Sequence, residues 1–331
     1  MEAQALHLLK AEGKEERTGY MAVASGKGGV GKTLITINIG RILSKKGKKV
    51  LIVDGDLGLS NVHIMLGITP AKNLYHFFMG EAPIEEVVVP IEENLAFISS
   101  GSGVRELVNL PPAQLKSLIY RLQEYAEKNY QWVIFDTPPG IHFDTTALVS
   151  SSHIPLIITT PEPTSIADAY GLIKVLNQEE KLKEFYLLVN KVQSDEEGIK
   201  VFESIKVVCE KFTSAEVRYL GSIRFNPKMI RNIINQNPFD ESLTRALILG
   251  ISLIIFDVLL ISSIFERLRP ATTLIKSLSP IFSLIVFITP STSFGFTASK
   301  SQSELSSKNS KLLATPKPSE RALCLFSSLT S

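Results

Sequence analysis

Short, continuously apolar segments alternate with longer amphipathic segments over the first 240 residues of the chain. Apolar runs without polar interruption indicate strands that helices cover on both faces of a sheet. The expected strands are residues 20–25, 50–54, 95–100, 132–136, 154–160, 185–190 and 217–223. The expected helices are residues 33–47, 112–128, 165–177 and 196–212. This repeated strand–helix–strand order predicts an α/β fold with a doubly wound, mostly parallel sheet.

The character of the chain changes after Asp240. Serine supplies 15 of the first 240 residues but 19 of the last 91, so the end of the chain differs from the body. Residues 246–265 are apolar, long enough to span a bilayer, and contain one charged residue, Asp257. Three interpretations of this segment stay open: a membrane segment, a buried helical extension, and a tail that results from a frameshift.

Composition narrows the classes of protein to consider. The formal net charge of +2 gives no reason to expect bulk nucleic-acid binding. The two cysteines, Cys209 and Cys324, have no CxxC or Cys/His spacing, which argues against a disulfide framework, a zinc site or an iron–sulfur cluster. The N-terminus has no basic region followed by an apolar core and a cleavage site, so we expect a cytoplasmic protein.

The stretch ASGKGGVGKTLI, residues 24–35, joins an expected strand to an expected helix. Gly26, Gly31, Lys32 and Thr33 satisfy the phosphate-loop pattern G-x4-G-K-[ST]. In such a loop, backbone N–H groups at a helix N-terminus surround a phosphate, and glycines allow the close approach. Lys32 would reach the β- and γ-phosphates, and the Thr33 hydroxyl would bind Mg²⁺. The residues expected to contact the nucleotide here are Gly26, Lys27, Gly28, Gly29, Val30, Gly31, Lys32, Thr33 and Leu34.

Carboxylates follow two further expected strands. Asp54 and Asp56 stand at the end of the strand at 50–54, and Asp136 ends the strand WVIFD. Ligands of open α/β sheets bind beyond the carboxyl ends of the strands, so we expect these side chains near the phosphate loop. Such carboxylates can hold magnesium or orient an attacking water, and Asp136 has the position expected of a Walker B acid. Gly140, in the turn that follows, could offer its N–H to the γ-phosphate.

The segments KGGVGKT, DGDLGLSN and DTPPG together resemble the ParA/MinD group of P-loop ATPases, of SIMIBI type, whose deviant Walker A motif is KGGxxGK[ST]. The resemblance covers about residues 18–240. It implies a nucleotide-dependent homodimer that sandwiches two ATP molecules with Mg²⁺. It also implies that Lys27 crosses the interface to the partner's nucleotide and that Asp56 positions the attacking water.

The same resemblance assigns the other site residues. Asp54 matches the aspartate that accompanies the water-positioning one, and Asp136 matches the Walker B acid. Asn190, in LLVNK, matches an asparagine that reads the adenine edge, which suits a side-chain amide because it can both donate and accept. The implied catalytic residues are Lys27, Lys32 and Asp56, and the implied metal ligands are Thr33, Asp54 and Asp136.

Within the group, SSGSGVRELVNLPPAQ and TPEPTSIADAYGLIKVL are more similar to the FlhG (FleN) family of flagellar-number regulators than to division-site MinD. The N-terminal AQALHLL resembles the DQAxxLR helix through which that family stimulates an FlhF-type GTPase. Gln4, Ala5 and Leu8 match it, whereas Ala3 and Leu9 replace its Asp and Arg. The implied function is an ATP-hydrolysing, dimerising switch that regulates flagellar number or placement through this GTPase, bound by residues 1–10.

Other functions stay open as alternatives. A MinD-like division-site or cargo-positioning ATPase would use the same chemistry with a different partner. A nucleotide-gated binding module would lack hydrolysis, and a metal-cluster carrier of Mrp/Nbp35 type would need bridging cysteines that the body lacks. No specific nucleic-acid partner is expected.

The resemblance divides the chain into three parts. Residues 1–17 are expected to form a partner-binding helix and linker, residues 18–240 the P-loop ATPase domain, and residues 241–331 an atypical apolar and then serine-rich tail. Relatives of this branch end in an amphipathic helix that docks reversibly on anionic membrane, whereas residues 246–265 are apolar all round. Peripheral attachment to the inner face of the cell membrane therefore remains an open expectation.

Overall fold

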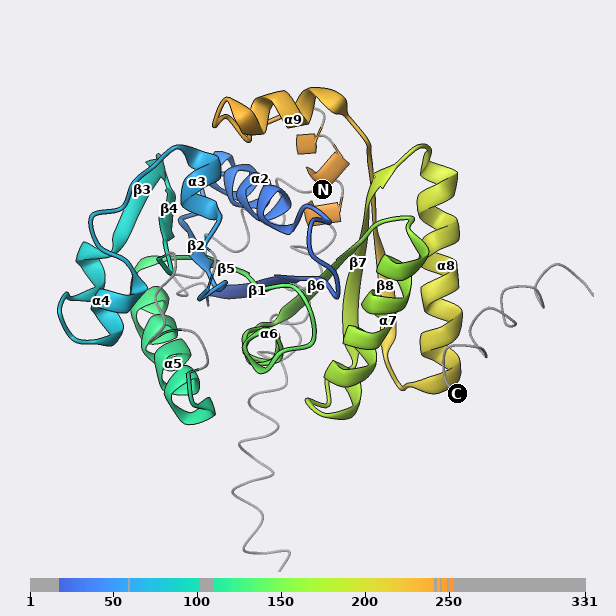
Figure 1. Ribbon diagram of the computed structural model, residues 1–331, viewed down its shortest axis with the longest axis horizontal. Helices are drawn as coiled ribbons and strands as arrows, with labels where there is room; N and C mark the ends of the chain where they lie inside the picture. The colour runs from blue at the N-terminus through green and yellow to red at the C-terminus, as the bar shows by residue number, and fades with distance from the viewer. Residues whose placement is uncertain are drawn as a thin grey trace, which may run out of the picture. The chain divides into compact units, whose positions relative to one another are not determined.

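An eight-stranded sheet forms the centre of the described part of the chain, in the order β3-β4-β2-β5-β1-β6-β7-β8 (Figure 1). The computed structural model describes residues 18–252, except 59, 102–106, 108–109, 241–242, 245 and 249. The strands are β1 (Gly19–Ala24), β2 (Val50–Asp54), β3 (Val88–Glu92), β4 (Leu95–Ile98), β5 (Trp132–Asp136), β6 (Ile154–Thr159), β7 (Glu184–Val192) and β8 (Glu216–Arg224). The helices are α2 (Lys32–Lys45), α3 (Val62–Leu66), α4 (Leu74–Phe78), the 3-10 helix η1 (Ile84–Glu86), α5 (Pro112–Asn129), α6 (Phe143–Ser150), α7 (Pro163–Gln178), α8 (Asp195–Phe212) and α9 (Pro227–Ile234).

The described sheet is parallel except at one edge, where β3 runs antiparallel to β4. The prediction of a mostly parallel, doubly wound sheet is therefore confirmed. β1 lies between β5 and β6, while β2, the next strand in sequence, lies on the far side of β5. The strand order thus reverses beside β1, and reversals of this kind leave a crevice at the carboxyl ends of the strands.

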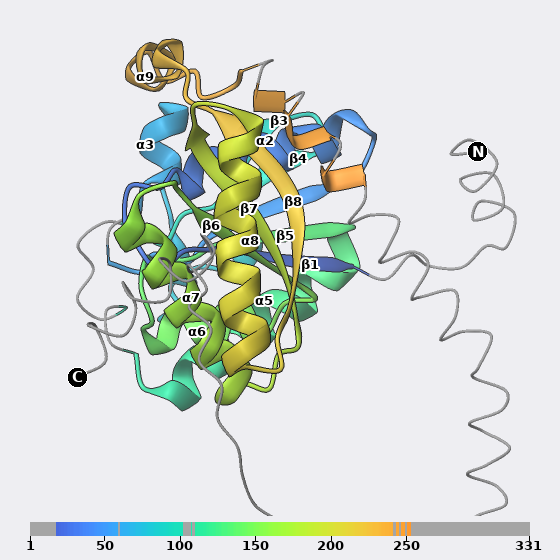
Figure 2. The ribbon, with the colours of Figure 1, turned by 90° about the vertical axis from the view of Figure 1, so that its right-hand side faces the viewer.

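Two apolar cores cover the two faces of the sheet. One core joins the sheet to α5, α6, α7 and α8, and the other joins it to α2 and α3 (Figures 1 and 2). Within β1, Ala22 and Ala24 belong to the first core, and Met21 and Val23 to the second. Because successive side chains point to opposite faces, a strand that is buried on both must be apolar throughout.

The predicted strands and helices all occur, with ends within two residues of the expected ones. The prediction missed several short elements, among them β3, α6 and α9. β3 contains Pro90, which is typical of edge strands and interrupts a strand-like pattern. α6 and α9 have eight residues each, which is too short to show a clear helical period.

The core continues beyond Asp240. Leu243, Leu247 and Ile251, four residues apart, are at most 3% exposed and pack in the core that contains α2. A spacing of four places these side chains on one helix face. Residues 1–17 and 253–331, which include the rest of that segment and the predicted partner-binding helix, lie outside the described residues. No helix within the described residues is both long enough and apolar enough to cross a membrane.

Candidate functional site

The connection from β1 to α2 turns tightly because of its glycines. Gly29 and Gly31 have φ values of 76° and 100°, a region that glycine adopts without strain, and Gly31 caps α2. Gly26 is required for a different reason. A Cβ at residue 26 would lie 2.3 Å from the backbone oxygen of Asp168, so the loop contacts the backbone of α7 directly.

Gly26→Ala is expected to destabilise the fold by about 1–3 kcal/mol, because the added methyl group meets a backbone oxygen that cannot move aside alone. Thermal and urea unfolding measure the change. Gly171→Ala, in α7, is the matched control, since its Cβ would meet only Ile141 at 3.5 Å and alanine favours a helix. Equal stability of Gly26→Ala and the unchanged protein would contradict the close packing of loop and helix.

The Lys32 side chain folds back into the loop. Lys32 is 8% exposed, and its Nζ donates a hydrogen bond to Ser25 Oγ at 2.8 Å. Ser25 Oγ in turn donates to the carbonyl oxygen of Lys27 at 2.7 Å. Burial lowers the pKa of the Lys32 ammonium, and the charges of Asp136 and Asp56 oppose that shift. The nearly buried Lys32 ammonium can bind an anionic ligand, and the neighbouring carboxylates can bind a metal ion that the ligand carries. Ser25 was not among the predicted site residues, because nothing but its place before Gly26 marks it.

Asp136 ends β5 beside the start of α2. Its Oδ1 accepts a hydrogen bond from Thr36 Oγ1 at 3.3 Å, and the Thr33 side chain lies near enough to the carboxylate to act on its pKa. Burial raises the pKa of Asp136 above its usual range, while the Thr33 side chain and the charge of Lys32 oppose the rise. The structure therefore brings together the predicted Walker B acid and the predicted metal-binding hydroxyl. Thr36 was missed, although it lies one helical turn after Thr33.

Asp54 lies at the end of β2 and is fully buried. Both of its carboxylate oxygens accept hydrogen bonds from the loop that follows. The donors are the Ser60 hydroxyl (2.6 Å) and the N–H groups of Asp56 (3.1 Å), Asn61 (3.0 Å) and Val62 (3.2 Å). Burial is the main cause that raises the pKa of Asp54. The contacts show that Asp54 holds the loop between β2 and α3, which the sequence did not predict.

Asp56 lies on that loop and is partly exposed. Its Oδ1 accepts a hydrogen bond from the N–H of Gly58 at 3.3 Å, and its carbonyl oxygen accepts one from Ser100 Oγ at 2.7 Å. Its charge acts on the pKa values of Lys32 and Asp136, so the three groups are neighbours. Asp54 thus positions a loop that presents a second carboxylate to the crevice.

The turn after β5 contacts the phosphate loop directly. The Gly140 N–H donates to the carbonyl oxygen of Ser25 at 2.9 Å, and Pro139 lies 3.9 Å from the position of a Cβ on Gly28. The sequence suggested that this N–H could bind a phosphate, but in this structure Ser25 occupies it. Gly140 has a φ of 96°, a glycine conformation, so the turn can lie this close to the loop.

The Lys27 side chain contacts residues at the start of α7. Its Nζ forms an ion pair with Glu162 at 2.5 Å and a hydrogen bond to Thr164 Oγ1 at 3.0 Å. The Lys27 and Glu162 side chains are 38% and 60% exposed. The hydrogen bond and charge of Lys27 lower the pKa of Glu162. Glu162 and Thr164 were not predicted as site residues, although they lie in the stretch TPEPTSIADAY that carried part of the resemblance.

Asn190, near the end of β7, contacts the phosphate loop. Its Nδ2 donates to the carbonyl oxygen of Val30 at 2.7 Å, and its Oδ1 accepts from the N–H of Lys191 at 2.9 Å. It is 7% exposed. A Cβ on Gly31 would lie 2.5 Å from its Nδ2, so the contact requires glycine there. The structure thus places the predicted base-reading residue against the phosphate loop.

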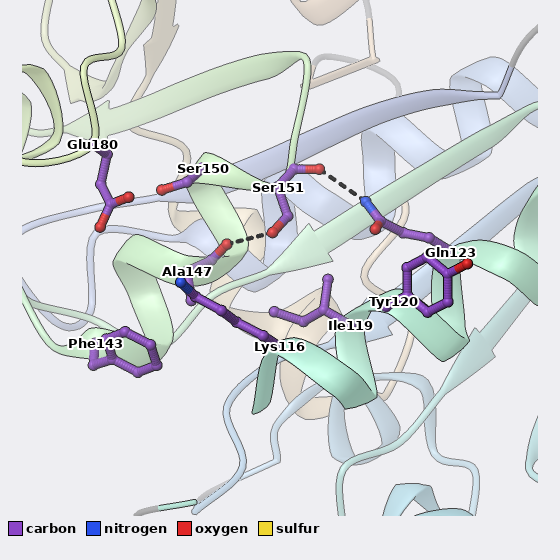
Figure 3. A pocket seen from close by; sticks show the side chains of 9 residues that line it. All are labelled: Lys116, Ile119, Tyr120, Gln123, Phe143, Ala147, Ser150, Ser151 and Glu180. Atoms are coloured by element: carbon purple, nitrogen blue, oxygen red, sulfur yellow. Dashed lines mark hydrogen bonds between the residues drawn. The ribbon is translucent and has the colours of Figure 1, made fainter. Parts of the chain in front are cut away.

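A separate hollow of about 240 Å³ lies between α5 and α6, with Glu180 at its rim (Figure 3). Gln123 and Ser151 approach each other there, and Gln123 Nε2 donates to the carbonyl oxygen of Ser151 at 3.1 Å. None of the predicted site residues lines this hollow. The candidate site is therefore the crevice around the phosphate loop.

The acids near the loop do not form a self-sufficient metal cage. Within the residues that the structure describes, no group of three or more His, Cys, Asp and Glu side chains is arranged to hold a metal ion. Mg²⁺ commonly binds through one or two protein groups together with substrate phosphates and water. Thr33 and Asp136 fit that pattern, because a hydroxyl and a carboxylate meet next to a loop shaped for phosphate.

Comparisons with known proteins agree with this geometry. The AAA domain family matches residues 18–190. The antiactivator FleN of Pseudomonas aeruginosa is 31% identical over 238 residues, which are 72% of this chain and 85% of that protein. The flagellum site-determining protein YlxH of Helicobacter pylori is 34% identical over 69% of this chain and 80% of that protein. The septum site-determining protein MinD of Pyrococcus horikoshii, solved with Mg-ADP, shares the fold with a TM-score of 0.57 and 23% identity, covering 70% of this chain and 94% of that one.

Proposed function

We propose that this chain, which belongs to the ParA/MinD-type P-loop ATPases, is a dimerising, ATP-hydrolysing switch. Because it resembles FleN and YlxH of the FlhG type, the switch is proposed to regulate the number or placement of flagella. The observation that carries the proposal is the phosphate loop with two lysines in different roles. Lys32 is buried inside the loop, whereas Lys27 is held at the surface. One lysine can therefore serve the chain's own nucleotide while the other is available to a partner.

The ligands proposed are ATP and Mg²⁺. The loop amides from Gly28 to Leu34 and the Lys32 ammonium bind the phosphates, because a helix N-terminus and a buried cation both favour negative charge. The metal is held by the Thr33 hydroxyl and, through water, by Asp136. When bound, Mg²⁺ neutralises charge on the β- and γ-phosphates. Asn190 is proposed as a contact of the adenine edge in addition to its contact with Val30.

Asp56 is proposed to orient the attacking water, since its carboxylate is partly exposed next to Lys32 and Asp136. Asp54 was also predicted as a metal ligand. We infer that it supports the loop instead, because four donors of residues 56–62 use its two oxygens. In this arrangement Asp54 fixes the backbone of Asp56, and Asp56 acts on the water.

The switch is proposed to depend on Lys27. In the single chain Lys27 is paired with Glu162, and in a dimer it would exchange that partner for the phosphates of the neighbouring subunit. A ligand shifts an equilibrium between two states only if it binds them with different affinity. The contact between Lys27 and the partner's nucleotide supplies that difference, so ATP favours the dimer.

The switch is proposed to act on flagella through an FlhF-type GTPase that binds residues 1–10. This binding would occur in the cytoplasm or at the inner face of the membrane. The names antiactivator FleN and flagellum site-determining protein YlxH support a flagellar readout. The partial match of AQALHLL to the DQAxxLR pattern supports the GTPase as the partner. Division-site MinD proteins are also similar to this chain, so a positioning ATPase with another partner is the second candidate.

Deletion of residues 1–12 is expected to abolish capture of the GTPase while ATP turnover is retained, because the phosphate loop lies outside the deleted segment. The measurement is a pull-down from flagellated cells with the full-length chain and the deletion, with ATPase assays of both. Capture of the GTPase by both proteins alike would refute the role of the N-terminus. Capture of division or cargo proteins in place of the GTPase would favour the second candidate.

A further inference from the structure

Two consecutive side chains at the end of β7 contact two consecutive carbonyl groups of the phosphate loop. Asn190 Nδ2 donates to the carbonyl oxygen of Val30 at 2.7 Å, and Lys191 Nζ donates to that of Gly29 at 2.8 Å. The contacts join positions 160 and 162 residues apart in the chain. The loop is thus held from outside by the strand that carries the predicted base contact.

The two contacts determine where the loop's N–H groups point. In a planar trans peptide, the C=O and the N–H of the next residue point in opposite directions. A donor on the Gly29 oxygen therefore turns the Val30 N–H away from Lys191, and a donor on the Val30 oxygen turns the Gly31 N–H away from Asn190. Both N–H groups are thus directed to the side of the loop opposite the β7 donors, and successive backbone N–H groups of such a loop are the groups that bind phosphate.

The backbone at Lys191 is held in a conformation that lysine rarely adopts. Its φ is 61°, in the left-handed region that disfavours side chains other than those of Gly, Asn and Asp. Such strain persists where surrounding contacts determine the conformation, and it is common at functional sites. Here the N–H of Lys191 donates to Asn190 Oδ1 and its ammonium donates to Gly29, so the contacts at both ends of the residue hold it in place.

Charge adds to this arrangement. Lys191 is one of the groups that lower the pKa of Glu162, whose main partner is Lys27. Glu162 is therefore near enough to both Lys27 and Lys191 for their charges to act on it. A carboxylate near both lysines reduces their mutual repulsion.

We propose that Lys191 is a positioning residue that aims the Val30 N–H at the β-phosphate of bound nucleotide, with Asn190 doing the same for the Gly31 N–H. The inference rests on the proposed nucleotide binding by this loop. Lys191 contacts neither phosphate nor base in this role. It acts through the peptide between Gly29 and Val30.

Lys191→Met is expected to weaken Mg-ADP binding about threefold to tenfold, the range suited to one charge-assisted hydrogen bond at an exposed site. AMP affinity should not change, because AMP has no β-phosphate for the Val30 N–H to contact. Isothermal titration with Mg-ADP, and competition by AMP, measure the two affinities. Lys191→Arg should restore most of the affinity for ADP, since the guanidinium is also a cationic donor of similar reach.

Two further variants separate the effect of the Lys191 ammonium from the effects of backbone strain and of losing an exposed lysine. Lys191→Gly removes the ammonium and also relieves the positive φ, so it should lose ADP affinity even though its backbone is unstrained. Lys200→Met changes an exposed lysine of α8 and should bind ADP like the unchanged chain. Thermal unfolding without nucleotide shows that each variant is folded.

The outcomes distinguish the inference from the function on which it rests. If the unchanged chain does not bind Mg-ADP, the proposed function itself is wrong. If the unchanged chain binds and Lys191→Met binds ADP equally well, the positioning role of Lys191 is wrong while the function stands. Equal weakening of ADP and AMP would also overturn it, because Lys191 would then act on the base or on the fold as a whole.

Discussion

Lys27→Ala is expected to abolish ATP-dependent dimerisation and to lower ATP turnover by about 100-fold or more, as follows when a cation that stabilises a transferred phosphoryl group is removed. ATP binding by the single chain should change little, because Lys32 and the loop amides remain. Light scattering with and without ATP measures the dimer, and phosphate release measures turnover. If Lys27→Ala dimerises and turns over ATP as the unchanged chain does, the proposed action of Lys27 on the partner's nucleotide is wrong.

Two matched variants sharpen this test. Lys174→Ala removes an exposed lysine of α7 and should leave both measurements unchanged. Glu162→Gln keeps Lys27 but removes the carboxylate that pairs with it, so dimerisation should occur at a lower ATP concentration. The gain should be at most severalfold, since both side chains are well exposed and exposed ion pairs are weak. The comparison of Lys174→Ala with Lys27→Ala shows whether the effect is specific to Lys27 or follows from the loss of any exposed lysine.

Asp56→Ala is expected to lower ATP turnover by about 10²- to 10⁴-fold, the range for loss of a group that assists proton transfer or orients the nucleophile. The ATP-bound dimer should persist, because Asp56 is not part of the phosphate loop. The variant therefore separates binding from hydrolysis, and it should accumulate as dimer where the unchanged chain returns to monomer. Single-turnover phosphate release and light scattering over time measure the two properties.

Asp56→Asn is the companion variant. It keeps an oxygen that can accept from the Gly58 N–H but removes the charge, so the loop should stay ordered while turnover stays low. Normal turnover in Asp56→Ala would refute the proposed action of Asp56 on the attacking water. Absence of ATP turnover in the unchanged chain would favour a nucleotide-gated binding module. Loss of the dimer in both variants would instead indicate that Asp56 serves the interface.

The parts of the fold that the sequence predicted well are those that local patterns encode. β2 and β5 have the predicted ends because each is a continuous apolar run that stops at an aspartate, Asp54 or Asp136. The phosphate loop follows from the spacing of Gly26, Gly31 and Lys32, since glycine conformations and a helix start are local properties. α9 was missed because its eight residues carry too short a pattern.

The assignment of roles around the loop needed the tertiary structure. The sequence predicts Asp54 as a metal ligand, and the structure adds that it accepts hydrogen bonds from the loop that carries Asp56. The sequence also suggests Gly140 as a phosphate contact, and in this structure its N–H donates to Ser25. In each case the residue type and spacing predict a role, and only the three-dimensional structure shows the partner that the residue takes.

Local sequence patterns are enough to predict a mostly parallel α/β sheet with a phosphate loop, an unusual early lysine and acids at two strand ends. The pairing of Lys27 with Glu162, 135 residues away, and the contact of Lys191 with Gly29 become visible only in the folded chain. A local pattern sets the conformation of its own segment, whereas contacts between distant segments depend on the strand order, which places the ends of β6 and β7 beside the loop that follows β1.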